Sequence, residues 1–171
     1  MEFKDLTKFD IDVRVCNIND KGASLLLYKD ARCDMRILDE IVGAENWQRK
    51  HYECKGNLFC SVGINVNYDT KDAQKEWIWK DDCGSESNAE KEKGEASDSF
   101  KRACFNWGIG RELYTAPFIW VGNDDINITG KKTYDRFVVQ KIIIEGGCIT
   151  ALAIYNQTKK ATCFIWQKDK K

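Results

Sequence analysis

The sequence predicts an α+β fold, with an antiparallel β-sheet packed against helices. Along several short segments, apolar residues alternate with polar ones, which is typical of strands that bury one face. Two other segments repeat their apolar residues at intervals of three and four, which is typical of amphipathic helices. A three-stranded meander precedes the second of these helices, so we expect a β-β-β-α order in the core.

The first part of the chain predicts a hairpin followed by a helix. Apolar and polar residues alternate over residues 11–16, residues 17–22 have the composition of a turn, and residues 23–28 form an apolar return strand. Asp30 is a good helix N-cap, and Gly43 is well placed to end the helix that it begins.

Three strands of a meander follow, at residues 47–54, 58–68 and 76–82. The second of them shows the clearest alternation in the chain. In the third, Trp77 and Trp79 project from one face of the strand. We expect these two side chains to lie in the core against the helix that follows; the alternative is that they stack nucleobases.

A second helix is predicted before the glycines at positions 108 and 110, which end it. Ser87 or Asn88 can cap its start. Its apolar stripe contains small residues in the first half and large ones in the second, so the packing partner should lie closer at the first half; the stripe consists of Ala89, Ala96, Phe100, Ala103 and Trp107.

The C-terminal part has the pattern of β-hairpins, after a short apolar stretch at residues 118–122. Gly146 and Gly147 suit a two-residue hairpin turn, because both positions can adopt positive φ. We expect residues 1–121 to form the core domain and residues 122–171 to form a C-terminal β-hairpin extension of the same domain.

Composition narrows the classes of function. The 171 residues are 43% hydrophobic, and 27 Lys and Arg balance 27 Asp and Glu. A net charge of zero excludes a uniformly basic nucleic-acid coat but allows a local basic stripe. With one His and no recognisable pair of nucleophile and base, we expect no enzyme activity.

The eight cysteines contain no C-x-x-C pair, so we expect neither structural zinc nor any other cofactor. They suit a reducing compartment. No apolar run reaches the roughly 18 residues that cross a bilayer. The first ten residues have no continuous hydrophobic stretch, so we expect no secretory signal. These features predict a cytoplasmic protein that does not contact membranes.

The second helix carries an adjacent basic pair, Lys101 and Arg102. Helical geometry places Lys101 near Gly94, Ser97 and Phe105, and the two small residues leave room for a phosphate backbone in front of the ammonium. Together the two cations can hold adjacent phosphates. The alternative from the residues alone is a solvated helix face with ordinary ion pairs.

Two blocks of sequence resemble one known family. The stretch "ASDSFKRACFNWGIGRELY" is similar to the signature helix of the Rad-fifty-two superfamily of single-strand annealing proteins, and "ARCDMRILDEIVGAENWQ" is similar to the family's first main helix and following tryptophan. The elements between the blocks come in the same order. The resemblance covers about residues 14–120 and is greatest to the short bacteriophage members.

The resemblance implies that Lys101 and Arg102 line a groove that holds single-stranded DNA. It also implies a further phosphate contact from the first helix, made by Arg32 or Arg36. Where eukaryotic relatives carry another cation one turn after the pair, this chain has Phe105, which weakens the electrostatic grip or replaces a charge with an aromatic surface.

Arg111, just after the glycines, is a candidate replacement for that missing cation. The alternative is a structural pair between Arg111 and Glu112.

The function implied by the resemblance is ATP-independent binding and annealing of single-stranded DNA in homologous recombination and double-strand break repair. An oligomeric ring of this chain would bind the DNA backbone without sequence preference, in the host cytoplasm if a phage encodes it. A host single-strand-binding protein is a further candidate partner. No Walker-type loop is present. The alternatives are a passive single-strand binder, a double-stranded-RNA-binding module and, through the acidic residues, a nuclease.

Overall fold

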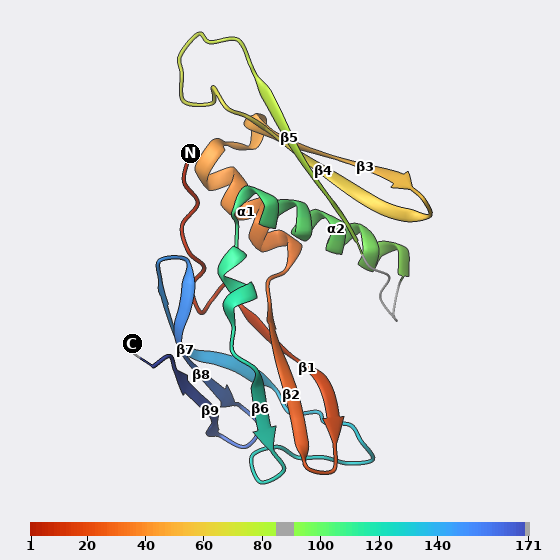
Figure 1. The fold of residues 1–171 in the computed structure, drawn as a ribbon, viewed down its shortest axis with the longest axis vertical. Coiled ribbons are helices and arrows are strands. Elements are labelled where there is room, and N and C mark those ends of the chain that lie inside the picture. The colour runs from red at the N-terminus through yellow and green to blue at the C-terminus, as the bar shows by residue number, and fades with distance from the viewer. Residues whose placement is uncertain (85–90, 170–171) are drawn as a thin grey trace. The chain divides into compact units, whose positions relative to one another are not determined.

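The computed structural model describes residues 1–84 and 91–169, which form two compact units (Figure 1). One unit comprises Met1–Lys4 and Asp30–Gly110, and the other comprises Asp5–Lys29 and Arg111–Lys171. Antiparallel sheets and helices make up the described chain, which confirms the predicted α+β class.

The first unit contains the predicted meander and both helices. Its sheet has the order β3-β4-β5, all antiparallel, and α2 packs on β4 and β5 (Figure 1). The elements in chain order are α1 (Ala31–Val42), η1 (Ala44–Asn46), β3 (Trp47–Cys54), β4 (Asn57–Asn65), β5 (Trp77–Cys83) and α2 (Lys91–Trp107).

Local signals set both ends of α1. The side chain of Asp30 accepts a hydrogen bond from the Cys33 N–H at 2.8 Å, which satisfies one of the free donors of the first turn. Gly43 has φ of 85°, and its N–H donates to the Asp39 carbonyl oxygen at 3.1 Å. The predicted start and end of this helix are therefore confirmed.

The core of the first unit lies between the sheet and α2. Cys60, Val62 and Ile64 of β4 are fully buried, as are Phe100 and Ala103 of α2. These are the alternate residues of the strand and the apolar stripe of the helix that the sequence predicts. The first residue of the stripe, Ala89, lies outside the described residues, as do the candidate caps Ser87 and Asn88.

The backbones of the sheet and α2 come very close in the first half of the helix. A Cβ added to Gly84, just after β5, would lie 2.3 Å from the Glu95 carbonyl oxygen. The Glu95 carboxylate also accepts a hydrogen bond from the Leu58 N–H at 2.9 Å. This approach matches the small residues that the sequence places in that half of the stripe.

Strand β4 ends at Asn65, three residues before the predicted end. The Asn65 Oδ1 accepts hydrogen bonds from the Asn67 N–H at 3.2 Å and from the Glu76 N–H at 3.0 Å. This side chain takes the place of strand pairing and turns the chain away, although the alternation of apolar residues continues to Tyr68.

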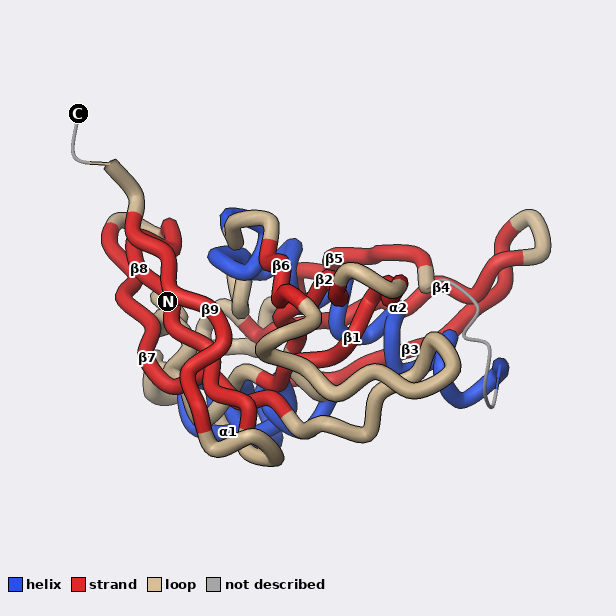
Figure 2. The backbone as a smooth tube through the Cα atoms, turned by 90° about the horizontal axis from the view of Figure 1, so that it is seen from below, coloured by secondary structure: helices blue, strands red, loops and turns tan. Residues whose placement is uncertain are grey.

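The second unit is a six-stranded sheet with the order β6-β2-β1-β7-β8-β9, and its strands are among those drawn in red in Figure 2. Strands on both sides of the expected boundary at residues 121 and 122 share it. Its elements are β1 (Asp12–Asn19), β2 (Gly22–Tyr28), η2 (Arg111–Thr115), β6 (Ile119–Gly122), β7 (Phe137–Glu145), β8 (Cys148–Asn156) and β9 (Ala161–Gln167).

The predicted glycine turn joins β7 to β8. Gly146 and Gly147 have φ of 58° and 71°, and Glu145 pairs with Cys148 across the turn. Positive φ at both central residues gives the twist that a two-residue hairpin requires. The hairpin prediction is confirmed.

We predict that the cap of α1 contributes a stability that depends on pH. Partial burial acts to raise the pKa of the Asp30 carboxyl, but hydrogen bonds from the Cys33 N–H and from Arg32 outweigh it and leave the pKa below 3.8. A lowered pKa in the folded state stabilises the fold above about pH 4, and this contribution is lost as the pH falls further.

The change Asp30→Ala should therefore lower the free energy of unfolding by about 1 kcal/mol at pH 7, with a smaller loss near pH 3. Urea denaturation at the two pH values measures this. Asp30→Asn is the matched control, because it keeps a capping oxygen without a titrating charge. An equal loss for Asp30→Ala at both pH values would contradict the assignment.

Candidate nucleic-acid interface

The orientation of α2 decides where its basic pair lies. Phe100 and Cys104 are fully buried on the side that faces the sheet. Because successive residues of a helix turn by about 100°, Lys101 and Arg102 fall on the flanks of the buried stripe. Their side chains are 23% and 44% exposed. Neither is enclosed in the core, and Arg102 reaches further into solvent.

Both cations of the pair contact carboxylates of the same unit. Lys101 Nζ lies 3.7 Å from Asp98 Oδ1, one turn earlier on α2. Arg102 donates through Nε to Asp82 Oδ1 on β5 at 3.3 Å. The ordinary ion pairs considered in the sequence are thus present. They orient the two cations, and they also lower the local positive potential that a phosphate would meet.

The two candidate arginines of α1 are ion-paired as well. Arg32, 89% exposed, holds Oδ2 of the capping Asp30 through Nε at 3.0 Å and Nη2 at 2.9 Å. Arg36, 48% exposed, pairs with Glu40 at 3.0 Å, four residues later. Both side chains are accessible, and α1 contacts α2 within the first unit.

The remaining two candidates, Phe105 and Arg111, belong to different units. Phe105 is half-buried on α2, one turn after Lys101. Arg111 begins η2 in the second unit, where it is exposed. The neighbouring Glu112 is buried, and its carboxylate accepts the Leu6 N–H at 2.6 Å. Five of the six candidate residues therefore belong to one unit.

Two further cations lie beside α2 and were not among the residues predicted for the site. The Arg49 guanidinium on β3 lies 4.8 Å from the centre of the Phe100 ring. Lys80 on β5 lies 4.5 Å from the centre of the Trp107 ring and donates to the Asn106 carbonyl oxygen at 2.9 Å. The strand pattern carries part of the signal for these two cations, because alternation places each of them on the same face as the helix-facing residues of its strand.

The expectation that Trp77 and Trp79 pack against α2 is wrong. Val62, which faces the helix, pairs with Arg49 and Lys80 across the sheet, whereas Trp79 pairs with Gly63. Side chains alternate between the faces of a sheet, so both tryptophans project from the face opposite α2. We call this the outer face of the β3–β4–β5 sheet. The sequence shows that the two share a face, but not which face the helix covers.

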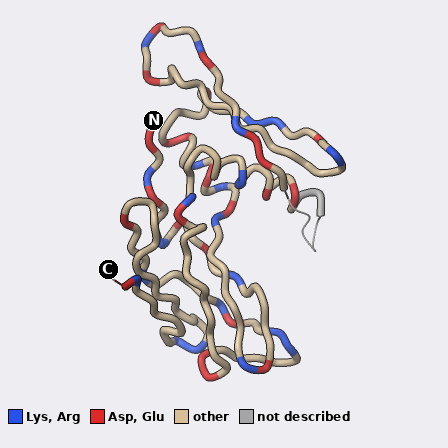
Figure 3. The backbone as a smooth tube through the Cα atoms, viewed as in Figure 1, with Lys and Arg blue, Asp and Glu red and all other residues tan. Residues whose placement is uncertain are grey.

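Charge is mixed along the whole described chain, and Lys and Arg segments interleave with Asp and Glu segments (Figure 3). This agrees with the formal net charge of zero. Any attraction for a polyanion must therefore come from local groups of cations rather than from a basic surface.

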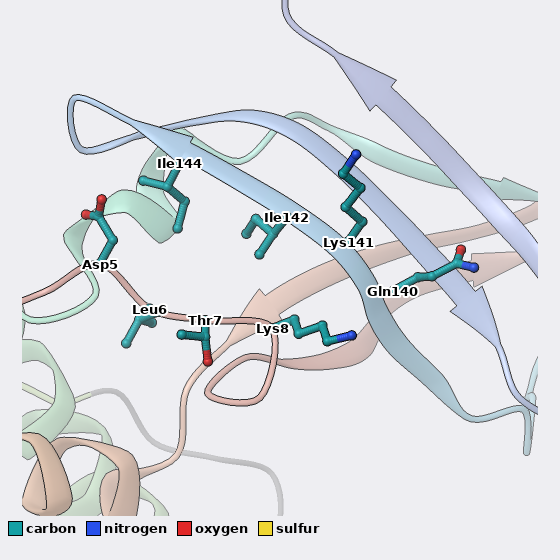
Figure 4. Close-up of a pocket in the computed structure, with 8 residues that line it drawn as sticks. All are labelled: Asp5, Leu6, Thr7, Lys8, Gln140, Lys141, Ile142 and Ile144. Atoms are coloured by element: carbon teal, nitrogen blue, oxygen red, sulfur yellow. The ribbon is translucent and has the colours of Figure 1, made fainter.

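The second unit has a pocket of about 430 Å³ between the N-terminal segment and β7 (Figure 4). Ile142 and Ile144 give it an apolar part, while Lys8 and Lys141 lie toward Gln140, away from Asp5 (Figure 4). The hydroxyl of the lining residue Thr7 donates to the Asp10 carboxylate at 2.6 Å.

Other kinds of site find no support in the described residues. No group of three or more His, Cys, Asp or Glu side chains gathers there as metal ligands would. None of the eight cysteines, all within the described ranges, forms a disulfide. No helix among residues 1–84 and 91–169 is both long and apolar enough to span a membrane.

Comparison with known families gives a match over most of the chain. The profile described as "Rad52/22 family double-strand break repair protein" matches residues 4–132. The chain belongs to the Rad52/22 family. The comparisons with curated proteins and with solved structures give no match.

The Rad52/22 match contains both sequence blocks on which the resemblance was based, and it places the chain among double-strand break repair proteins. It spans α1, the β3–β4–β5 sheet and α2 with all six candidate site residues. Strands β7, β8 and β9 follow the matched region.

We predict that Trp107 stabilises the α2 packing in this Rad52/22 member. Its ring is half-buried, and its Nε1–H donates to the Val62 carbonyl oxygen at 2.9 Å. Trp107→Ala should lower the free energy of unfolding by about 2–4 kcal/mol, which lowers the melting temperature by roughly 2–4 °C for each kcal/mol.

Differential scanning calorimetry measures the shift. Trp107→Phe is the control, because it keeps an apolar ring and loses only the hydrogen bond, so its melting temperature should fall between the other two. An unaltered melting temperature for Trp107→Ala would show that this ring does not hold the helix in place.

Proposed function

We propose that this protein binds and anneals single-stranded DNA in homologous recombination and double-strand break repair, without ATP or another cofactor. One observation carries the proposal: a chain of the Rad52/22 family presents an adjacent Lys101 and Arg102 on the flank of a helix that is anchored to a sheet. No bond is made or broken in this function, so it requires no catalytic group.

The chemistry of the pair suits a sugar-phosphate backbone. Lys101 supplies a compact charge, and Arg102 supplies a planar guanidinium that can bind a phosphate with two hydrogen bonds. The carboxylates of Asp98 and Asp82 hold these cations in place before DNA arrives. A phosphate that approaches must share the cations with the carboxylates or displace them, which makes each contact moderate and reversible.

The other candidate residues extend this backbone contact. In our proposal, Arg32 and Arg36 bind phosphates from α1, and Phe105 contributes an aromatic surface in place of a cation. Arg111 supplies a further positive charge from η2. Residues 1–121 constitute the annealing core, and residues 122–171 its C-terminal extension.

Binding through the backbone explains how annealing can occur without sequence preference. Contacts to phosphate and sugar carry no sequence information. They neutralise the charge that keeps two strands apart while the bases stay unpaired and available. A second strand can then be tested for complementarity, and a correct match forms a duplex.

The modest charge of one protomer requires many protomers to act together. Each neutralised phosphate of a single strand contributes about −0.7 to the slope of log affinity against log salt. A few such contacts are weak in isolation, but they sum when copies of the chain hold one strand along a ring. We therefore propose a homo-oligomeric ring that acts in the cytoplasm. If a phage encodes the protein, this is the cytoplasm of the host cell. A host single-strand-binding protein is a candidate partner.

We predict that Lys101→Ala with Arg102→Ala abolishes annealing and leaves the fold intact. The double variant should bind a single-stranded oligonucleotide at least tenfold more weakly at physiological salt, because each protomer loses two phosphate contacts. Fluorescence anisotropy measures binding, and the rate of duplex formation from complementary oligonucleotides measures annealing.

A matched control removes one Lys and one Arg from β7 and the residue before it, with Lys141→Ala and Arg136→Ala. Both side chains are exposed and lie in the other unit. This control should keep both activities. Unchanged affinity in the Lys101 and Arg102 variant would refute the site, and a wild-type protein that slows the pairing of strands would be a passive binder.

Removal of a competing carboxylate should have the opposite effect. Asp98→Asn leaves Lys101 without its acidic neighbour at 3.7 Å, so we predict an affinity for single strands that is roughly two- to fivefold higher, in line with the strength of exposed ion pairs. The gain should shrink as the salt concentration rises.

Asp124→Asn makes the same change in net charge at an exposed position of the second unit. It should leave the affinity unchanged in the same anisotropy titration. An equal gain from both variants would assign the effect to net charge and not to the environment of Lys101.

A further inference from the structure

The outer face of the β3–β4–β5 sheet is unusually rich in aromatic side chains. The register places Trp77 and Trp79 of β5, Phe59 of β4 and Tyr52 of β3 on this face. Tyr52 is exposed, and the other three rings are half-buried. The helix covers the opposite face, so these rings are not part of the core that fixes α2.

The Trp79 ring lies flat on the sheet because its cross-strand neighbour is a glycine. A Cβ added to Gly63 would lie 2.8 Å from three atoms of the Trp79 indole, closer than any real side chain allows. The Trp77 ring follows, with its centre 6.3 Å away and its plane tilted by 32°. Tyr52 and Phe59 form a second stack with centres 5.5 Å apart.

Lysines accompany the two tryptophans. Lys50 Nζ on β3 lies 4.1 Å from the centre of the Trp79 ring, and Lys75 Nζ lies 5.7 Å from the centre of the Trp77 ring. Both lysines are exposed, so their long side chains can move aside for a ring and bind the phosphate beside it. Flat aromatic rings with adjacent cations are the two features that bind unpaired nucleotides.

The composition of this face favours a nucleic acid over another protein chain. Protein–protein contacts are depleted in lysine at their centres, whereas here each tryptophan has a lysine near its ring. The outward residues of the three strands include no Leu, Ile, Val or Met, which would fill a protein core.

We propose that this outer face stacks unpaired bases of a single strand, with Trp77 and Trp79 as the main stacking rings and Lys50 and Lys75 as phosphate contacts. The inference rests on the proposed function, because it takes single-stranded DNA as the ligand. It adds a contact to the bases, which the backbone site on α2 does not make.

The test compares an oligothymidylate with an abasic strand that has the same number of phosphates. Wild-type protein should bind the oligothymidylate more tightly, by about fivefold for each stacked base. Trp77→Leu with Trp79→Leu should remove this preference, because leucine keeps an apolar surface but cannot stack. Trp79→Phe should keep much of it.

Trp120→Leu is the matched control, since Trp120 is 37% exposed on β6, in the other unit. It should retain the wild-type preference. The Lys101→Ala and Arg102→Ala variant should bind both strands more weakly and still prefer the one with bases. Failure of wild-type protein to bind either strand would therefore refute the proposed function, whereas equal binding of both would refute base stacking alone.

A second readout needs no variant that might fold poorly. Irradiation of wild-type protein with a 5-iodouracil-substituted strand should cross-link it to Trp77, Trp79 or Tyr52, as identified by mass spectrometry of the peptides. Cross-links confined to other residues would overturn the proposal. A leucine variant with unchanged strand preference but a smaller native mass would also overturn it, and would identify the face as a contact between copies of the chain.

Discussion

The burial of Phe100 between α2 and the sheet is the constraint on which the candidate interface depends. Its ring is fully buried, stacks on Trp47 with centres 6.0 Å apart, and has the Arg49 guanidinium above it. Once Phe100 points inward, helical geometry turns Lys101 by about 100° and Arg102 by about 200° away from it, so neither side chain can enter the core. A rotation of α2 by one residue would bury the Lys101 ammonium, at a cost of several kcal/mol, so the apolar stripe fixes the direction of the basic pair.

The ion pairs of the first unit bear on how a chain with no net charge could bind a polyanion as proposed. Each cation of the pair has a carboxylate within 4 Å, which partly neutralises its charge. In water such pairs contribute only about 0–1 kcal/mol, and a phosphate can compete with them. In the proposed function, each protomer would therefore bind a strand weakly and affinity would come from repetition along a ring, which suits a protein that must release the strand as a duplex.

The sequence predicted those features that depend on neighbouring residues. Asp30 and Gly43 bound α1, and the glycines after Trp107 end α2, because caps act within one turn of a helix. The stripe of α2 identified the face that carries Lys101 and Arg102. The end of β4 was missed because the Asn65 side chain, and not the strand pattern, closes that turn.

Features that depend on distant residues could not be predicted in this way. The side of the sheet that α2 covers is set by tertiary packing, so the strand pattern could pair Trp77 with Trp79 but not assign their face. Strand alternation shows which residues share a face with Arg49 and with Lys80, but that this face is the one that α2 covers depends on the same tertiary packing. The joining of β1 and β2 to β7, β8 and β9 in one sheet links residues more than 100 positions apart, which local periodicity does not report.

The register of the three-stranded sheet ties the two proposed DNA contacts to each other. Adjacent residues of a strand serve opposite faces, so Lys80 lies at the Trp107 ring while Trp79 lies on Gly63. A slip of one residue would exchange the two faces and destroy both surfaces at once. The absence of a side chain at Gly63 admits the Trp79 ring only in the observed register, where the same alignment directs Val62 into the core. The seat of one tryptophan on one glycine therefore helps to hold the sheet in the alignment that α2, and with it the basic pair, requires.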